Sequence, residues 1–378
     1  MKNLGLYIHI PFCIRKCDYC DFYSLCHSYE LEEEYIDALC THIKSEAYLY
    51  KECAFDTAFI GGGTPSVLSP KSFDKLSQCI KDSLNLTKDI EFTIEANPGT
   101  LNKEKLNCYK NNGVNRLSMG LQSTNNKELS TLGRIHTVSE FEESYYLARE
   151  CGFDNISIDI MYGLPNQSLS DFKKTLDHVC DFNPEHISAY CLKIEENTPF
   201  FKKQATLLLP SDEEEYEMYM ALCTTLEKRG WSQYEISNFA KEGRRSRHNL
   251  KYWLSQEYVG FGPSSHSFFN GVRYFYPRDI QGYINSIKNE SLTKILEENE
   301  DNAHINKMDE YVLLKLRLSD GISIIEFKER FDKDFLCEYP SIEKYIKSGH
   351  VSLKNGFYSF TPKGFFVSNY ILTDILHF

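Results

Sequence analysis

The first two-thirds of the chain alternate short apolar runs with longer stretches of helical spacing, and this alternation constrains the fold more than any other feature. Six runs predict β-strands: Leu4–Ile10, Thr57–Ile60, Glu91–Glu95, Arg116–Leu121, Ile156–Met161 and Ile187–Leu192. Repeated βα units predict a parallel sheet with helices outside it. We therefore expect an α/β fold, a partial (β/α)6 barrel of the TIM type, with functional residues at the C-terminal ends of its strands. Six strands are fewer than the eight of a closed barrel, so we expect a lateral opening that suits a large flat ligand.

The predicted helices carry local start signals. The stretch from Leu31 to Ile43 repeats apolar residues every three or four positions. Capping boxes open two further helices, at Ser168-x-x-Asp171 and Ser211-x-x-Glu214. Another helix opens with Ser69-Pro70, a capping residue followed by proline at the first helical position.

The pattern changes in the last third of the chain. An acidic stretch at 297–301 predicts a solvated linker, and helices are predicted over Met308–Leu318 and Ile324–Phe331. Val351–Phe360 predicts a β-hairpin, with Asn355-Gly356 suited to a type I′ turn. Helices followed by a hairpin resemble a winged-helix module, which we interpret as a scaffold or lid.

These changes divide the chain into three predicted parts. The barrel covers 1–235, a connecting segment covers 236–300, and a C-terminal helical and hairpin domain covers 301–378. We find no internal repeat beyond the βα alternation and no low-complexity segment.

The charge and the cysteine content limit which binding partners and which cellular compartment are expected. A formal net charge of −12 without a basic stripe argues against nucleic-acid binding. The locally basic segment 241–248 is short and suits an anionic ligand such as a propionate. We see no signal peptide and no apolar run of roughly 18 residues, so no transmembrane segment is expected. Thirteen cysteines in such a chain favour a reducing, cytoplasmic location.

Three cysteines follow the first predicted strand. Cys13, Cys17 and Cys20 have the spacing C-x3-C-x2-C, and no fourth cysteine completes the set in the same loop. An electron-transfer [4Fe–4S] cluster takes four thiolates, so three would leave one iron open to another ligand. Half of a zinc site is the alternative, since zinc takes four ligands in paired sets and His9 and His27 lie nearby in the sequence. The spacing favours the iron–sulfur interpretation.

The cysteine loop resembles that of the radical S-adenosylmethionine (SAM) superfamily. The resemblance implies that the amino and carboxylate groups of SAM bind the fourth iron. It also implies that electron transfer from the cluster cleaves the sulfonium to give a 5′-deoxyadenosyl radical. The loop Gly61-Gly62-Gly63-Thr64-Pro65, one βα unit later, is similar to the superfamily's motif for the SAM amino group. Its glycines let the backbone approach a ligand closely, although a plain tight turn is the simpler alternative.

Later strands each deliver a polar side chain at or near the C-terminal end. These residues are Glu95, Gln122 and Asp159, and Arg134 follows in the loop beyond the fourth strand. Carboxylates suit ribose hydroxyls or an ammonium group, and a guanidinium can clamp a carboxylate with its rigid donor fork. Each residue alone fits a structural buried polar group equally well, but several at strand ends are hard to explain by core packing.

Longer motifs together resemble the oxygen-independent coproporphyrinogen III oxidase family over about residues 4–270, and more loosely to the end. These motifs are Tyr7–Cys13, Gly61–Ser66, Glu95–Pro98, Ser118–Ser123, Gly133–His136, Asp159–Gln167 and His186–Tyr190. The resemblance implies that the cluster is held by Cys13, Cys17 and Cys20. It implies a SAM site formed by Tyr7, Tyr19, Gly62, Gly63, Thr64, Glu95, Gln122, Arg134 and Asp159.

One position separates the two branches of that family. The branch that oxidises porphyrinogens has a further cysteine where this chain has Phe22, and Phe22 is what the HemW branch of haem chaperones carries. The stretch Arg247-His248-Asn249-Leu250-Lys251-Tyr252-Trp253 also resembles that branch, where it is linked to haem. Relatives often have cysteine where this chain has Ser246, so a thiolate role there is absent.

Two histidines are candidates for axial haem ligation. His248 is flanked by aromatic residues, which suits a neutral imidazole packed against a macrocycle. A hydrogen-bonded structural histidine is the alternative. His266, in the glycine-rich stretch 260–267, is the second candidate.

The resemblance therefore implies a cytoplasmic haem chaperone that binds a [4Fe–4S] cluster, SAM and haem. Its expected partners are haem, a reductant protein such as flavodoxin or ferredoxin, and a haem-receiving respiratory protein, which we place at the membrane surface. One alternative is an oxygen-independent coproporphyrinogen III dehydrogenase, which Phe22 counts against. The other is a radical SAM enzyme acting on a different substrate, so enzymatic activity stays open.

Overall fold

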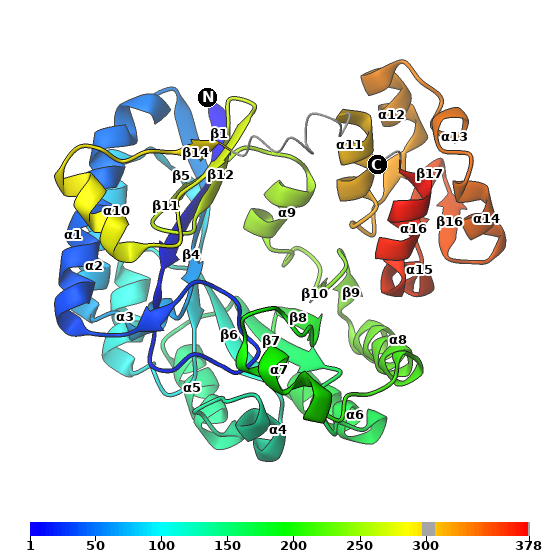
Figure 1. Ribbon diagram of the computed structural model, residues 1–378, viewed down its shortest axis with the longest axis horizontal. Helices are drawn as coiled ribbons and strands as arrows, with labels where there is room; N and C mark the ends of the chain where they lie inside the picture. The colour runs from blue at the N-terminus through cyan, green and yellow to red at the C-terminus, as the bar shows by residue number, and fades with distance from the viewer. Residues whose placement is uncertain (297–306, 377–378) are drawn as a thin grey trace.

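The computed structural model describes residues 1–296 and 307–376 of the 378-residue chain. The predicted acidic linker at 297–301 lies outside the described residues. A large curved sheet with helices along its outer side forms the main body, and a smaller C-terminal unit, orange to red in Figure 1, stands beside it. No helix in the described ranges is long and apolar enough to cross a membrane.

The main sheet has twelve strands in one continuous order. From one edge to the other they are β14 (Ile295–Leu296), β13 (Val272–Phe275), β12 (His266–Phe269), β11 (Tyr258–Phe261), β1 (Lys2–Ile10), β4 (Cys53–Gly62), β5 (Leu86–Ala96), β6 (Arg116–Gln122), β7 (Ile156–Tyr162), β8 (His186–Cys191), β10 (Asn238–Ala240) and β9 (Ser232–Gln233). The strands β1 and β4 to β8 are the six predicted ones, and they pair in parallel as predicted. Because β14 and β9 are the two ends of this order, the sheet is open.

The strands outside the predicted six flank them on both sides. β11 pairs in parallel with β1, so Tyr7 lies opposite Gly260. The strands beyond β11 and beyond β8 are antiparallel. The predicted connecting segment 236–300 therefore supplies five strands, β10 to β14, to the main sheet.

Helices follow the parallel strands and cover the outer side of the sheet (Figure 1). In chain order the helices of the main body are α1 (Tyr29–Glu46), α2 (Pro70–Ser83), α3 (Lys103–Asn111), α4 (Asn126–Thr131), α5 (Val138–Glu150), α6 (Leu169–Phe182), α7 (Pro199–Lys203), α8 (Asp212–Arg229), α9 (Arg247–Trp253) and α10 (Ile280–Lys288). Short 3-10 turns are η1 (Ala47–Tyr50), η2 (Pro65–Val67) and η3 (Gln204–Thr206). The predicted caps at Ser69, Ser168 and Ser211 each accept a backbone N–H of the first helical turn, as expected of N-caps.

The two faces of the parallel strands differ in chemistry. Leu6, Ile8 and their neighbours on the outward face are fully buried against the helices, as in an ordinary parallel sheet. The alternating positions on the inward face are polar instead, for example Glu95, Arg116 and Asp159. A parallel sheet is normally apolar on both faces, so this polar interior marks the functional side.

The C-terminal unit combines helices with a three-stranded antiparallel sheet of order β15-β17-β16. Its elements are α11 (Lys307–Lys315), β15 (Ile322–Ser323), α12 (Ile324–Phe331), α13 (Phe335–Glu338), α14 (Ile342–Lys347), β16 (Val351–Lys354), β17 (Phe357–Phe360), α15 (Pro362–Phe366) and α16 (Ser368–Ile375). The predicted hairpin is confirmed, and Asn355 (φ 53°) and Gly356 (φ 79°) have the positive φ that a type I′ turn needs. Arg245 pairs with Asp320 at 2.8 Å and joins this unit to the main body.

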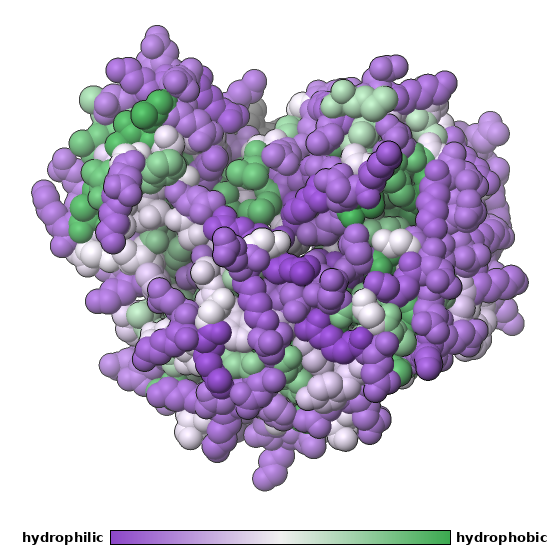
Figure 2. Space-filling model, turned by 180° about the vertical axis from the view of Figure 1, so that it is seen from behind, coloured by the Kyte–Doolittle hydropathy of each residue, from purple (hydrophilic) through white to green (hydrophobic). Residues whose placement is uncertain are grey.

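Most of the molecular face seen in Figure 2 is hydrophilic, and its apolar side chains gather in separate small patches. This surface agrees with the formal net charge of −12.

Candidate functional site

The cysteine loop lies at the C-terminal end of β1 and is tied to neighbouring elements by backbone bonds. The short strands β2 (Phe12–Cys13) and β3 (Leu25–Cys26) pair in parallel and close the loop at its base. Asp18 donates its backbone N–H to Leu132 O at 3.0 Å, which anchors the middle of the loop. Cys13, Cys17 and Cys20 are each half-buried, so their thiols lie at the boundary between protein and solvent.

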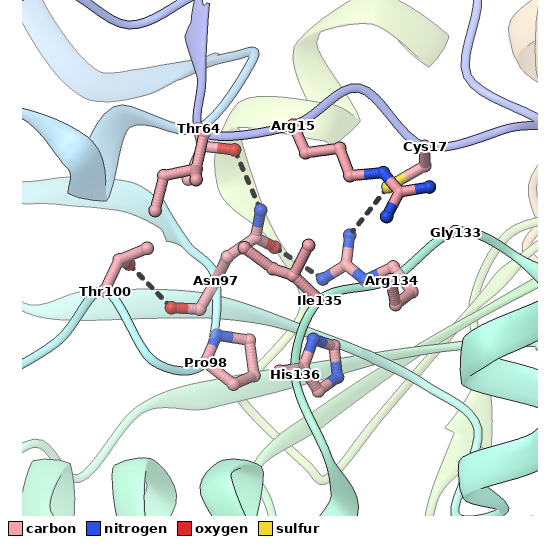
Figure 3. Close-up of a pocket in the computed structure, with 11 residues that line it drawn as sticks. Arg15, Cys17, Thr64, Asn97, Pro98, Thr100, Gly133, Arg134, Ile135 and His136 are labelled. Carbon is pink, nitrogen blue, oxygen red and sulfur yellow. Dashed lines mark hydrogen bonds between the residues drawn. The ribbon is translucent and has the colours of Figure 1, made fainter.

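Arg134 connects this loop to the ends of β5 and β6 (Figure 3). Its Nη1 donates to Cys17 Sγ at 3.5 Å, and its Nη2 donates to Asn97 Oδ1 at 2.7 Å and to Gly120 O at 2.9 Å. Its Nε is buried and has no hydrogen-bond partner among the described residues. Since an unmet buried donor is costly, this N–H is suited to an anionic oxygen of a ligand.

Thr64 and Asn97 form the opposite wall of the same pocket (Figure 3). Thr64 Oγ1 lies 3.5 Å from Cys13 Sγ and accepts from Asn97 Nδ2 at 2.8 Å. The pocket is also lined by Arg15 and His136. The pocket thus brings together the Cys17 sulfur, the Arg134 guanidinium and the Asn97 amide, and Cys13 Sγ lies beside its Thr64 wall.

The glycines at the end of β4 and directly after it lie close to β1 and to the residue that precedes Cys13. Gly62 has φ +117°, and a Cβ there would lie 2.7 Å from the His9 ring. A Cβ at Gly63 would lie 2.6 Å from Phe12 O, directly before the cysteine loop. These contacts require glycine and bring the ends of β1 and β4 together.

Two half-buried carboxyl groups lie on the inward face of the sheet. Glu95 accepts the Gly62 N–H at 3.0 Å, and burial together with the neighbouring Asp159 raises the pKa of Glu95 to about 8. Asp159 accepts from Ser118 at 3.1 Å and Ser157 at 3.3 Å, and burial raises its pKa as well. Neither Glu95 nor Asp159 lines the pocket of Figure 3. A ligand would therefore have to extend beyond this pocket, toward the inward face of the sheet, to contact them.

The remaining predicted SAM residues surround this centre. The side chains of Gln122, Asn97 and Arg134 converge, since a Cβ at Gly120 would meet all three within 3.2 Å. Gln122 itself has φ 69° where β6 ends. Tyr19 lies beside Arg134 and Cys17.

Tyr7 stands on the inward face at the centre of the sheet. Its hydroxyl lies 3.1 Å from His9 Nδ1, and its ring stacks on Phe59. Burial raises its pKa well above the ordinary value, so the phenol is neutral at physiological pH.

Sequence reasoning missed several residues of this site. Asn97 was part of a quoted motif but had no assigned role, although it links Thr64 to Arg134. Arg116 was placed in a strand, yet its side chain is almost fully buried inside the sheet and its Nε has no partner among the described residues. The polar residue on the otherwise apolar strand Arg116–Leu121 was the available signal.

The two histidine candidates for haem occupy different environments. His248, at the start of α9, is 1% exposed; its Nδ1 lies 2.9 Å from Thr57 Oγ1 and its Nε2 lies 2.8 Å from Tyr252 OH. Burial lowers its pKa to about 3. Both ring nitrogens of His248 are therefore engaged in hydrogen bonds. This arrangement agrees with the alternative that His248 is a structural histidine. His266 is exposed on β12 and stacks on Phe275 with ring centroids 5.2 Å apart.

Comparison with known proteins gives the family. The radical SAM superfamily matches residues 7–179, and the HemN C-terminal domain matches residues 302–367. The chain is 37% identical to the haem chaperone HemW of Bacillus subtilis over 89% of each protein, and 33% identical to that of Escherichia coli over 98% of each. The chain belongs to the HemW family of radical SAM proteins. Membership implies a [4Fe–4S] cluster and SAM as cofactors.

A solved structure supports the fold of this HemW family member. Coproporphyrinogen III oxidase (HemN) from Escherichia coli, described as a radical SAM enzyme, superposes with a TM-score of 0.84 over 98% of this chain and 89% of that one. The two are 22% identical, so the likeness concerns the fold. It confirms the predicted radical SAM barrel followed by a C-terminal helical domain.

The donor set of this HemW family member suits both implied cofactors. One loop carries three half-buried thiols, which is the number of thiolates that a cluster with one open iron takes. Arg134 lines the pocket, and its buried Nε, which has no hydrogen-bond partner in the part of the chain that the structure describes, suits a carboxylate.

Proposed function

We propose that this chain is a radical SAM-type haem chaperone, which holds a [4Fe–4S] cluster on Cys13, Cys17 and Cys20, binds SAM beside it, and delivers haem to respiratory proteins. The observation that carries the SAM part is Arg134, whose guanidinium contacts Cys17 and Asn97 while its Nε has no partner among the described residues. The chaperone part rests on the relatives named haem chaperones.

When bound, the cluster and SAM supply low-potential electron transfer to the sulfonium. The protein's own residues bind and orient. Arg134 would donate to the carboxylate of SAM, and Thr64 and Asn97, which are hydrogen-bonded to each other, would form the pocket wall beside it. Glu95, neutral in the ligand-free protein, gives up its proton and accepts from a cationic group. Tyr7 and His9 hold the glycine loop in place below.

Haem binds through His266 in this proposal. The side chain of His266 is exposed at the surface, whereas that of His248 is buried and both of its ring nitrogens are hydrogen-bonded. A macrocycle can therefore reach the His266 ring without a rearrangement of the main body, and an imidazole is a common axial ligand of haem. Ligation by His248 would require it to leave Thr57 and Tyr252 and would expose a side chain stacked on Phe59.

The test is anaerobic cluster reconstitution followed by haem titration in the Soret region, with and without SAM. We expect stoichiometric binding in the wild type, loss in His266→Ala, and no change in His178→Ala, a surface histidine paired with Glu142. Loss only in His248→Ala, with the fold intact by circular dichroism, would move the ligand to α9. No haem binding by any preparation would end the chaperone proposal.

The porphyrinogen dehydrogenase alternative has its own readout in the same samples. Formation of 5′-deoxyadenosine together with a vinyl product from coproporphyrinogen would make the chain an enzyme. Phe22 is 63% exposed on the cysteine loop, at the position where the oxidising branch has a further cysteine. We therefore expect no such product.

The proposed partners follow from this function. A flavodoxin- or ferredoxin-type protein would supply the electron, and a respiratory protein at the membrane surface would take the haem from this cytoplasmic carrier. Mixing haem-loaded protein with membranes that contain haem-free respiratory protein, and following the Soret band from one to the other, tests the delivery step.

A further inference from the structure

Cys26 lies beside a proposed cluster ligand, on a strand that sequence analysis did not find. It pairs with Cys13 in the parallel ladder of β2 and β3. The two strands are held by bonds from Leu25 N to Pro11 O at 2.7 Å and from His27 N to Cys13 O at 3.0 Å. Opposed residues of a parallel ladder point their side chains to the same face, so the two thiols lie on one side.

The spacing of this pair fits a disulfide. Neighbouring strands lie about 4.8 Å apart, which is inside the range of roughly 4.4–6.8 Å that disulfides span between their Cα atoms. The Cys26 thiol currently donates to Ile14 O at 3.6 Å, a weak bond that it can give up. A sulfur–sulfur bond here therefore needs side-chain rotation and little backbone movement.

Accessibility separates Cys26 from the other thiols. Of the thirteen cysteines, Cys26 and Cys337 are exposed. Cys40 and Cys79 are also neighbours, with Cys79 Sγ 3.5 Å from Cys40 O, but both are buried between α1 and α2. A small oxidant reaches Cys26 first and finds Cys13 next to it.

We propose that Cys13 and Cys26 form a disulfide whenever the cluster is absent and a low-molecular-weight disulfide is present. The Cys26 thiolate attacks one sulfur of glutathione disulfide and releases one glutathione thiolate. The Cys13 thiolate then attacks the Cys26 sulfur of the mixed disulfide and releases the second glutathione. Two protein thiols are oxidised, and one glutathione disulfide is reduced to two glutathiones.

The bond removes one of the three proposed cluster ligands, so it blocks cluster assembly until a reductant opens it. This consequence rests on the proposed function, whereas formation of the disulfide does not. Iron bound to Cys13 prevents the reaction, because the ligand sulfur is no longer a free nucleophile. The cluster-free protein would thus be stored in a reversible state and protected from irreversible oxidation of Cys13.

Peptide mapping tests the bond directly. Cluster-free protein is treated with glutathione disulfide, alkylated and digested with trypsin and chymotrypsin, which separates Cys13, Cys17, Cys20 and Cys26 onto four peptides. We expect the linked pair Cys13–Cys26 as the main product, and a simple glutathione adduct at Cys337, the matched exposed cysteine. A Cys17–Cys20 link as the main product, or Cys26 found only as its glutathione adduct, would overturn the proposal.

Iron content tests the consequence. After the same treatment we expect at least a fivefold loss of iron uptake in the wild type, restored by dithiothreitol, and undiminished uptake in Cys26→Ser. Cys337→Ser should behave as the wild type. If reduced wild-type protein takes up no iron, the proposed function fails while the peptide map still decides the disulfide. Equal losses in the wild type and Cys26→Ser would show that the bond does not control assembly.

Discussion

Arg134 is the residue on which the proposed SAM site depends most. It approaches a cysteine sulfur, an amide oxygen and a main-chain carbonyl from one guanidinium, and keeps one N–H unused among the described residues. Lysine cannot reproduce this fork, because a single ammonium has no planar array of donors.

Arg134→Ala should weaken SAM binding by about 1.5–3 kcal/mol, the value of a hydrogen bond to a charged group, or roughly 10- to 150-fold in Kd. Isothermal titration of reconstituted protein with SAM measures this change. Arg229→Ala, which removes a surface arginine paired with Asp181, is the control and should leave Kd unchanged. Equal affinity in both variants would place Arg134 outside the site.

We expect Glu95 to make the affinity for SAM depend on pH. Its pKa is raised to about 8, so at neutral pH the free protein carries the acid form, and binding a cation must release a proton. Affinity should therefore rise with pH up to about 8, by at most about tenfold per unit, and then level off. Titrations between pH 6.5 and 8.5 should show a steeper rise in the wild type than in Glu95→Gln. If the affinities of the wild type and Glu95→Gln changed with pH in parallel, Glu95 would not be the group that loses a proton on binding.

Some of the site residues could be predicted from the sequence, and others could not. The three cysteines and the glycine loop are local motifs, and the structure places Cys17 and Thr64 in one pocket, with Cys13 Sγ beside Thr64. The bridge from Thr64 through Asn97 to Arg134 joins three elements distant in sequence, so residue order alone could not reveal it. The same holds for His248, whose hydrogen bond to Thr57 spans 191 positions.

At the scale of elements, the glycine loop after β4 sets how closely the cysteine loop can approach the sheet. Gly62 combines a left-handed φ with a Cβ position occupied by the His9 ring, and His9 is itself held by Tyr7 and Tyr23.

Gly62→Ala should therefore destabilise the protein by more than the ~1–2 kcal/mol of left-handed strain alone. Gly113→Ala is the matched control, because Gly113 also has positive φ but open space around its Cβ position. The difference in Tm between the two variants gives the part of the destabilisation that comes from contact with the His9 ring, because both variants share the left-handed strain. Equal changes in Tm would mean that His9 moves aside at no cost.

Element boundaries were predictable where the signal was long or carried turn chemistry. The helix Ile324–Phe331 and the Asn355-Gly356 turn agree with the structure. The strands β11 to β14 have two to four residues each, which is too short for a periodic pattern to reveal them, and β11 lies beside β1, which is distant in the sequence. The strands β2 and β3 have two residues each, so they too are too short to be predicted from a periodic pattern.

For the whole molecule, histidines that are buried in the neutral form make the stability of the fold depend on pH. Burial lowers the pKa of His9 and His136 to about 4 and of His248 to about 3, whereas unfolded histidine titrates near 6.5. Each group therefore favours the folded state above pH 6.5, and this contribution is lost as pH falls toward the folded-state pKa.

Tm should fall steeply between pH 6.5 and 4, with each histidine contributing up to about 1.4 kcal/mol per pH unit. Calorimetry across this range measures the slope. His248→Gln should show a shallower slope than the wild type, and His266→Gln, which replaces an exposed histidine, should not. A slope unchanged in His248→Gln would show that His248 is not held neutral by the fold.

The position of β1 between β4 and β11 has a consequence for biosynthesis. Its second neighbour, residues 258–261, leaves the ribosome long after the cysteine loop does. At roughly 5–20 residues per second, the delay is on the order of 10–50 s. During that interval the nascent chain carries Cys13, Cys17 and Cys20 next to a strand paired on one side only. We therefore expect the cysteine loop to reach its final position, and to take up metal, only after most of the polypeptide has been translated.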